Sequence, residues 1–222
     1  MNMKDIMFFL ADLRRNNTRD WFQANRKRYE SCREEYLDIV QSVIHAVSGF
    51  DLRLNDLKAR DALFRINRDI RFSNDKSPYK THFGAYMARG GRKSPEAGYY
   101  MHVSPDEVFI AAGSYSPEKE RLKVIRQEIL FQPESYMGIV ESMKEKGFVP
   151  MSEDRLKTAP KDFPRESPYI DLVRDKHYIV SRVLTAEEIG SDDFPLVAGN
   201  LFRKTFPYVA FLNEAMEFIG NE

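Results

Sequence analysis

The chain has 222 residues, of which 42% are hydrophobic and 31% are charged, with 11 glycines and 11 prolines. This composition is typical of a folded globular chain and excludes a disordered, collagen-like or low-complexity protein. The 34 basic and 34 acidic side chains balance, which excludes the overall positive charge of many nucleic-acid-binding proteins. The single cysteine, Cys32, excludes an internal disulfide bond and a cysteine-rich zinc site, and it indicates a reducing compartment.

Export and membrane signals are absent from the pattern of apolar residues. The apolar run at residues 6–11 is too short for the core of a signal peptide, and no small-residue cleavage site follows it. No stretch approaches the roughly 18 consecutive apolar residues of a membrane span. We therefore expect a cytoplasmic protein that does not contact a membrane.

The first 59 residues have the pattern of helices. Apolar residues at 6, 9, 10 and 13 share one face of a first helix, which should end at Asn16-Asn17-Thr18. Thr18 is a suitable N-cap for a long amphipathic helix that ends at Gly49. Residues 50–59 show no clean period and are expected to form a connection.

From Leu63 the pattern changes to the two-residue period of strands. A strand near residue 64 should place Phe64 and Ile66 on one side, with Arg65 and Asn67 on the other. Residues 73–78 have the composition of a loop. Further strands are predicted at residues 81–89, 98–103 and 108–115, which together make an antiparallel sheet.

The last part of the chain returns to a helical pattern. Helices are predicted at 117–131 and 133–146, followed by an irregular, proline-containing stretch at 158–168. One further strand is possible at 178–184, and a helix at 192–218 should be interrupted near Pro207. Helices before and after a run of strands indicate an α+β fold with a central antiparallel sheet of about four or five strands. We expect one domain over 1–222: a helical part at 1–59, a β-meander at 60–116 and a second helical part at 117–222.

The most distinctive motif lies between residues 64 and 81. Residues 64–66 read Phe-Arg-Ile, residues 68–73 read Arg-Asp-Ile-Arg-Phe-Ser, and residues 75–81 read Asp-Lys-Ser-Pro-Tyr-Lys-Thr. This segment resembles a motif of domain-of-unknown-function family 2461, a family of conserved hypothetical proteins. The resemblance extends to residues 16–22 with Asn25 and Tyr29, to residues 99–103, and to Gly113 with Pro117. It supports the boundaries of the fold and implies no activity, cofactor or site residue.

The same motif carries a local excess of positive charge. Residues 60–93 hold nine basic and three acidic side chains, a net charge of +6. Arginine and lysine on a loop between strands suit the capture of a phosphate or carboxylate. The alternative is an internal network in which Asp69 and Asp75 pair with the arginines and fix the loop. The residues predicted to bind a ligand are Arg65, Arg68, Arg71, Lys76, Tyr79 and Lys80.

Strand alternation also predicts a polar and aromatic sheet face. It should contain Arg65, Asn67, His82, Tyr86, Tyr100 and His102. If it is open, it can stack bases or a nucleotide ring. We expect instead that the helix carrying Trp21 covers at least part of it, so that the polar tips find partners within the fold.

The sequence allows an enzyme as an alternative. Asp69 or Asp75 could act as general base or metal ligand, with His82 or His102 moving protons. No spacing of ligands supports a metal site, and no motif identifies a cofactor. The turn at residues 89–94 lacks a glycine that a phosphate-binding loop requires, and Cys32 lies on the apolar side of a helix.

The prediction from sequence is therefore a protein that binds a phosphate-bearing small molecule, a nucleotide or a nucleic acid through the basic segment. The alternative is a hydrolase or phosphoryl-transfer enzyme that uses Asp69 or Asp75 with His82 or His102, with or without a metal. A third possibility is an interaction protein that uses its acidic helices.

Overall fold

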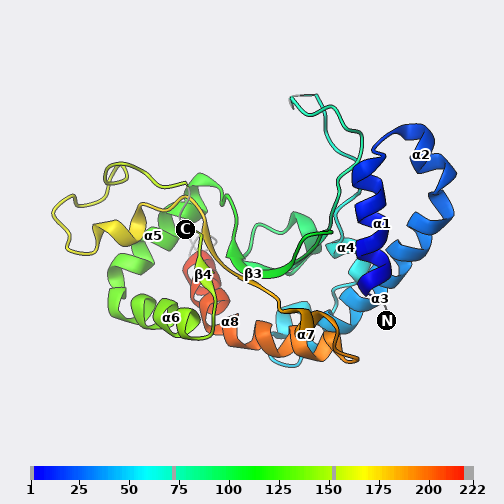
Figure 1. The fold of residues 1–222 in the computed structure, drawn as a ribbon. Coiled ribbons are helices and arrows are strands. Elements are labelled where there is room, and N and C mark those ends of the chain that lie inside the picture. The colour runs from blue at the N-terminus through cyan, green and yellow to red at the C-terminus, as the bar shows by residue number, and fades with distance from the viewer. Residues whose placement is uncertain (1–2, 72–73, 152–153, 218–222) are drawn as a thin grey trace.

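A five-stranded antiparallel sheet lies at the centre of the computed structural model, which describes residues 3–71, 74–151 and 154–217 (Figure 1). The strands occur in the order β1-β2-β3-β5-β4 across the sheet. Their bounds are β1 Phe83–Met87, β2 Gly98–Val103, β3 Val108–Ser114, β4 Val149–Pro150 and β5 Tyr178–Val183. The α+β class and the predicted number of strands are confirmed. The short β4 was not predicted; it ends in a proline, which an edge strand tolerates because one of its sides needs no hydrogen-bond donor.

The N-terminal helices pack beside the β1 edge of the sheet (Figure 1). They are α1 Met3–Arg15, α2 Arg19–Ala24, α3 Arg26–Ser48, the 3-10 helix η1 Leu52–Leu54 and α4 Ala59–Ala62. Thr18 is the N-cap of α2, as predicted, and accepts a hydrogen bond from the backbone N–H of Trp21. The single long helix predicted after it is wrong, because Asn25 leaves the helical conformation and donates its side-chain N–H to the carbonyl of Trp21.

The C-terminal helices lie beyond the β5–β4 edge and beneath the sheet in Figure 1. They are α5 Lys119–Phe131, α6 Pro133–Glu145, the 3-10 helix η3 Ile170–Val173, α7 Ala186–Ile189 and α8 Phe194–Glu217. Residues 158–168 are irregular, as predicted. The predicted interruption of the last helix is wrong, because α8 continues through Pro207. Pro207 is exposed, whereas Tyr208 and Phe211 beside it are buried, so packing compensates for the missing N–H. Phe218 of the predicted range lies outside the described residues.

One face of the sheet is buried and forms the main core. Phe83, Met87, Met101 and Val103 are all less than 5% exposed and contribute to this core, as the strand alternation predicted. Helices α3 and α8 pack together beneath the sheet, and the Tyr36 hydroxyl donates to the Met101 carbonyl over 3.0 Å. One cluster of buried residues joins α1, the sheet and α8.

Residues 64–71 and 74–80 rise from the β1 edge side by side as an arm, which we call the basic arm (Figure 1). It has isolated bridges, Leu63 to Ala85 and Asn67 to Tyr79, rather than the full strand predicted from residue 63. Ile66 is 4% exposed but Phe64 is 39% exposed, so the two do not share a side as predicted. Four residues of alternation are too few to fix the register of such a segment. Ser73 of the predicted loop lies outside the described residues.

Candidate functional site

The sheet face opposite α3 and α8 carries a groove of about 620 Å3. In Figure 1 this face lies between the basic arm and the α5 helix. The prediction that the helix with Trp21 covers this face is wrong: no residue of that helix is among the lining residues of the groove, and Trp21 packs against Phe9 of α1 with ring centroids 6.1 Å apart. The polar and aromatic face is therefore accessible from one side of the molecule.

Small residues make the groove deep. Gly98 pairs with Gly113 and Tyr100 pairs with Ala111, so three of four neighbouring positions on the floor lack a large side chain. Gly113 has φ of +127°, and a Cβ there would lie 2.0 Å from the Tyr178 carbonyl oxygen. The backbone at this point thus requires glycine and keeps the floor open.

Aromatic rings stand on the floor at the other end of these strands. His102 of β2 stacks on His82 with centroids 4.5 Å apart, and on Phe109 of β3, also at 4.5 Å. Both faces of the His102 imidazole are therefore occupied. Gly84 of β1 leaves space for the Tyr100 ring, because a Cβ there would lie 2.6 Å from the Tyr100 hydroxyl. The groove is lined by His82, Tyr100 and Phe109, but His102 is not among its described lining residues.

Both imidazoles favour the neutral form. Burial lowers the pKa of His102 to about 4, with a further contribution from His82. Burial, then Lys80 and Arg68, lowers the pKa of His82. The Tyr100 hydroxyl lies 3.2 Å from Nδ1 of His102, and burial raises the pKa of Tyr100 to about 12. Tyr100 thus keeps its proton and shares a hydrogen bond with Nδ1, in which the His102 tautomer sets the donor.

Ion pairs within the basic arm confirm that an internal network exists. Arg71 makes two hydrogen bonds to Asp69, at 2.9 and 2.6 Å, and Arg68 pairs with Asp75. The contact with Arg71 lowers the pKa of Asp69 well below its usual range. Lys76 donates to the Ile70 carbonyl over 3.0 Å. Arg68, Arg71 and Lys76 therefore have partners inside the arm, and all these pairs are at least partly exposed.

Lys80 and Arg65 are basic residues of the arm that make no ion pair with a carboxylate among the described residues. Arg65 acts on Asp69 only through its charge, and it contributes to the lowered pKa of that carboxyl. Lys80 lines the groove, with Nζ 5.6 Å from the centre of the Phe64 ring. Burial lowers the pKa of Lys80, and Arg65 and Arg68 lower it further. Positive charge is thus concentrated where the base of the arm meets the groove.

The other residues predicted for the site lie apart from one another. Tyr79 is 6% exposed and stacks on Phe22 at 3.9 Å, so its ring belongs to the core and not to a ligand surface. Asp69 and Asp75 lie on the arm beside arginines, and neither is among the groups that shift the pKa of His82 or His102. Across the described parts of the chain, no three His, Cys, Asp or Glu side chains are grouped as a metal site would require.

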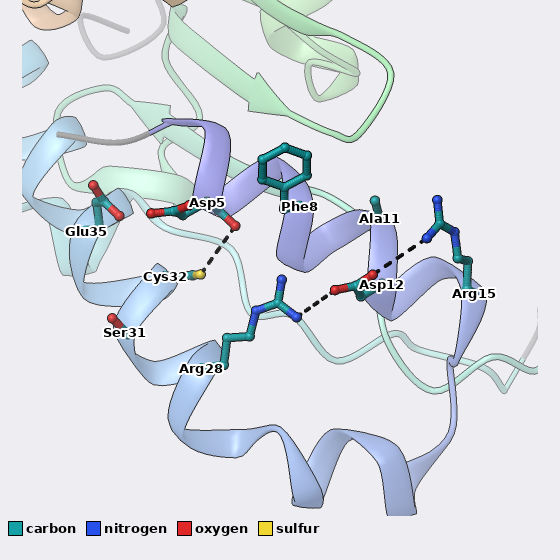
Figure 2. A pocket seen from close by; sticks show the side chains of 9 residues that line it. All are labelled: Asp5, Phe8, Ala11, Asp12, Arg15, Arg28, Ser31, Cys32 and Glu35. Atoms are coloured by element: carbon teal, nitrogen blue, oxygen red, sulfur yellow. Dashed lines mark hydrogen bonds and ion pairs between the residues drawn. The ribbon is translucent and has the colours of Figure 1, made fainter.

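A second hollow, of about 610 Å3, lies between α1 and α3 (Figure 2). Arg28 donates to Asp12 over 2.6 Å, and Arg15 lies 3.7 Å from the other oxygen of the same carboxylate. Cys32 is buried with Sγ 3.8 Å from the Asp5 carbonyl, and burial raises the pKa of its thiol. The hollow therefore has paired charges and an unreactive thiol, so the sheet groove is the better candidate site.

Two groups of groove residues were not predicted from the sequence. Gly98, Ala111 and Gly113 form the floor only after the register of β2 and β3 is known. Tyr115 and Ser116 follow β3 at the end of the groove that also holds Gly113. The one feature of the sequence that points to Tyr115 and Ser116 is a tyrosine directly after a strand, and this feature alone does not identify a binding site.

The fold and the groove together define an α+β protein with one covered and one accessible sheet face. The family model described as conserved hypothetical protein (DUF2461) matches residues 5–211, and the chain belongs to this family. The resemblance seen in the sequence motifs is thus confirmed. No curated protein and no solved structure matches the chain. Among the described residues, none of the helices has the length and apolar character to cross a membrane.

Proposed function

We propose that this protein binds a phosphate-bearing small molecule in the sheet groove, with Lys80 as the central anion contact. The observation that carries the proposal is the position of Lys80. It lines the groove, it has no carboxylate partner among the described residues, and it lies near Arg65 and Arg68. Arg65, Arg68, Arg71 and Lys76 do not line the groove, and in this proposal they add positive potential from the arm.

Electrostatics favours an anion at this point. Lys80, Arg65 and Arg68 lie near one another and repel, and among the three only Arg68 makes an ion pair, with Asp75. A bound phosphate would reduce the repulsion and would bind in partly desolvated surroundings, where charge-assisted hydrogen bonds are stronger than in bulk water. Neutral His82, also in the groove, can donate one N–H to the same ligand.

The geometry favours a small molecule over a nucleic-acid strand stacked along the floor. His102 covers one face of each of the lining rings His82 and Phe109, so the column offers no run of open ring faces for successive bases. Base stacking needs an open ring face. The enzyme alternative lacks a comparable observation, because Asp69 and Asp75 pair with arginines on the arm and do not meet the histidines.

A thermal-shift panel tests the proposal. The probes are inorganic phosphate, pyrophosphate and ribose 5-phosphate, each with the wild-type chain, Lys80→Gln and Lys27→Gln. Lys27 is an exposed lysine of α3, outside the groove, and serves as the matched control. A probe at about 100 times its Kd stabilises by about 2.7 kcal/mol, a shift of about 5–10 °C for a chain of this size. A shift that Lys80→Gln removes and Lys27→Gln retains supports the proposal, and no shift with any probe contradicts it.

The compartment and the partners follow from the same reasoning. The chain has one cysteine, and Cys32 is buried as a free thiol, which suits a reducing environment. The proposal therefore places the protein in the cytoplasm, with a phosphorylated metabolite as its ligand. Labelling intact cells with a membrane-impermeant reagent, followed by detection of this chain, tests the location.

A further inference from the structure

Tyr115 forms an aromatic platform at the end of the groove. It follows the last residue of β3, lines the groove and is 67% exposed. Its ring stacks on the His177 imidazole with centroids 4.5 Å apart and planes only 9° from parallel. An exposed tyrosine is normally free to rotate, but this stacking holds the ring in one orientation.

The platform is fixed from behind by His177. The Ser116 backbone N–H donates to Nδ1 of His177 over 2.9 Å, so the proton of the neutral imidazole is on Nε2. Nε2 faces a carboxylate oxygen of Asp154 at 3.6 Å. Ser116 has φ of +52°, a left-handed conformation that is costly for a non-glycine residue. The strained backbone persists because these contacts hold it, and the strain lies beside the groove.

One face of the Tyr115 ring remains free. His177 covers a single face, and the high exposed fraction shows that the opposite face is accessible. Other lining rings also have a neighbour on one side: His102 covers one face of His82 and one face of Phe109, and Lys80 lies over one face of Phe64. Tyr115 is 67% exposed against 39% for Phe64, and it is therefore the ring best placed to stack on a planar group.

We infer that the ligand of the groove is a mononucleotide whose base stacks on Tyr115; this inference rests on the proposed phosphate-binding function. Gly113, Gly98 and Ala111 leave the floor beside Tyr115 open for a sugar. Lys93 lines the groove in the turn that follows β1, and β1 lies two strands, about 10 Å, from β3 across the sheet.

The charges give the ligand a direction. Glu118 lines the groove only three residues after Tyr115, whereas the lining cations lie on the β1 side, Arg92 and Lys93 after β1 and Lys80 before it. Glu96 also lines the groove, and its carboxylate pairs with Arg89. Arg92 already donates to the Asp61 carbonyl over 3.0 Å, so Lys93 is the freer cation at the end of β1 toward Gly98, and Lys80 lies at the opposite end. A phosphate is repelled by Glu118 and attracted to the β1 side, whereas an uncharged base is not repelled at the Tyr115 end.

Isothermal titration calorimetry with adenosine 5′-monophosphate and ribose 5-phosphate tests the inference. The proteins are the wild type, Tyr115→Phe, which keeps the ring, and Tyr115→Leu, which removes it. Stacking on an aromatic side chain corresponds to a change in affinity of about 5- to 100-fold. The nucleotide should bind the wild type more tightly than the sugar phosphate by that factor. Tyr115→Leu should remove the difference without weakening the sugar phosphate, and Tyr115→Phe should keep it.

Controls separate this inference from the proposed function. Phe131→Leu removes an aromatic ring that is 80% exposed outside the groove and should leave both affinities unchanged. Equal affinities for the two probes, unaltered by Tyr115→Leu, overturn the base platform and leave phosphate binding intact. Binding of neither probe overturns both. Tighter binding of a ten-residue oligonucleotide than of the mononucleotide overturns the choice of a small ligand.

Discussion

The imidazole of His102 stacks on the ring of Phe109 with centroids 4.5 Å apart and planes 14° from parallel, on the groove side of the sheet. His82 covers the other side of the same imidazole. Burial disfavours the charged imidazolium, and the positive charge of a protonated His82 would disfavour it further. The pKa of His102 is therefore low, at about 4. The arrangement couples the stability of the aromatic floor to pH.

The first prediction concerns acid stability. As the pH falls from 6.5 to 4, the unfolded chain protonates position 102 before the folded chain does, so the free energy of unfolding should decrease. We expect His102 to account for a decrease of about 1–2 kcal/mol in the free energy of unfolding, after allowance for solvent screening. His102→Gln should show a correspondingly shallower dependence of urea stability on pH. His45→Gln, at an exposed position of α3, should keep the wild-type dependence, and equal slopes for His102→Gln and wild type would contradict the prediction.

The second prediction concerns the ion pairs of the basic arm. Arg68→Ala with Arg71→Ala removes partners of Asp75 and Asp69. Because these pairs are exposed, the double variant should stay folded and lose less than about 2 kcal/mol of unfolding free energy. Its pyrophosphate affinity should fall several-fold as the potential at Lys80 decreases. The matched control is Arg26→Ala with Arg33→Ala, which removes two exposed helix pairs and should leave affinity unchanged. An unfolded double variant would show that the arginines of the arm are structural.

The sequence predicted β1, β2 and β3 well because these three strands follow one another closely along the chain. Tyr86, Tyr100 and His102 were assigned to one face from alternation alone, and the pairing of β1 with β2 confirms it. The same method misplaced Phe64, since the arm makes bridges rather than a continuous ladder. Alternation is informative only where a ladder extends over several residues.

Contacts between distant parts of the chain could not be predicted in the same way. Tyr115 and His177 are 62 positions apart, and neither lies in a motif that identifies the other. Tyr79 was read as a ligand contact from its basic neighbours, whereas its ring stacks on Phe22 in the core. His177 lies between η3 and β5. No local sequence pattern predicts its position, which depends on the tertiary packing of the chain.

The third prediction concerns how the arm is held. The Asn17 side chain donates to the Tyr79 carbonyl over 2.9 Å and accepts from the Tyr79 N–H over 3.1 Å. Asn17→Ala leaves both backbone groups without a partner and should cost about 1–3 kcal/mol. Hydrogen exchange at the Tyr79 amide should become faster. Asn16→Ala loses only one exposed bond to the Asp12 carbonyl and should leave that exchange unchanged. Unaltered protection of Tyr79 in Asn17→Ala would mean that other contacts hold the arm.

The fourth prediction compares two glycines, one on the groove floor and one on a helix surface. Gly113 has φ of +127°, and a Cβ there meets the Tyr178 carbonyl oxygen at 2.0 Å, so Gly113→Ala must shift the β3–β5 pairing. Its carbonyl also accepts from the Tyr86 hydroxyl over 3.2 Å, so the same shift should disturb the groove wall. We expect a loss of more than about 3 kcal/mol by urea denaturation. Gly138→Ala, in an open position of α6, should instead gain up to about 1 kcal/mol. Wild-type stability of Gly113→Ala would contradict the prediction. It would show that the backbone at position 113 can accept a Cβ and that the shape of the groove floor does not depend on glycine there.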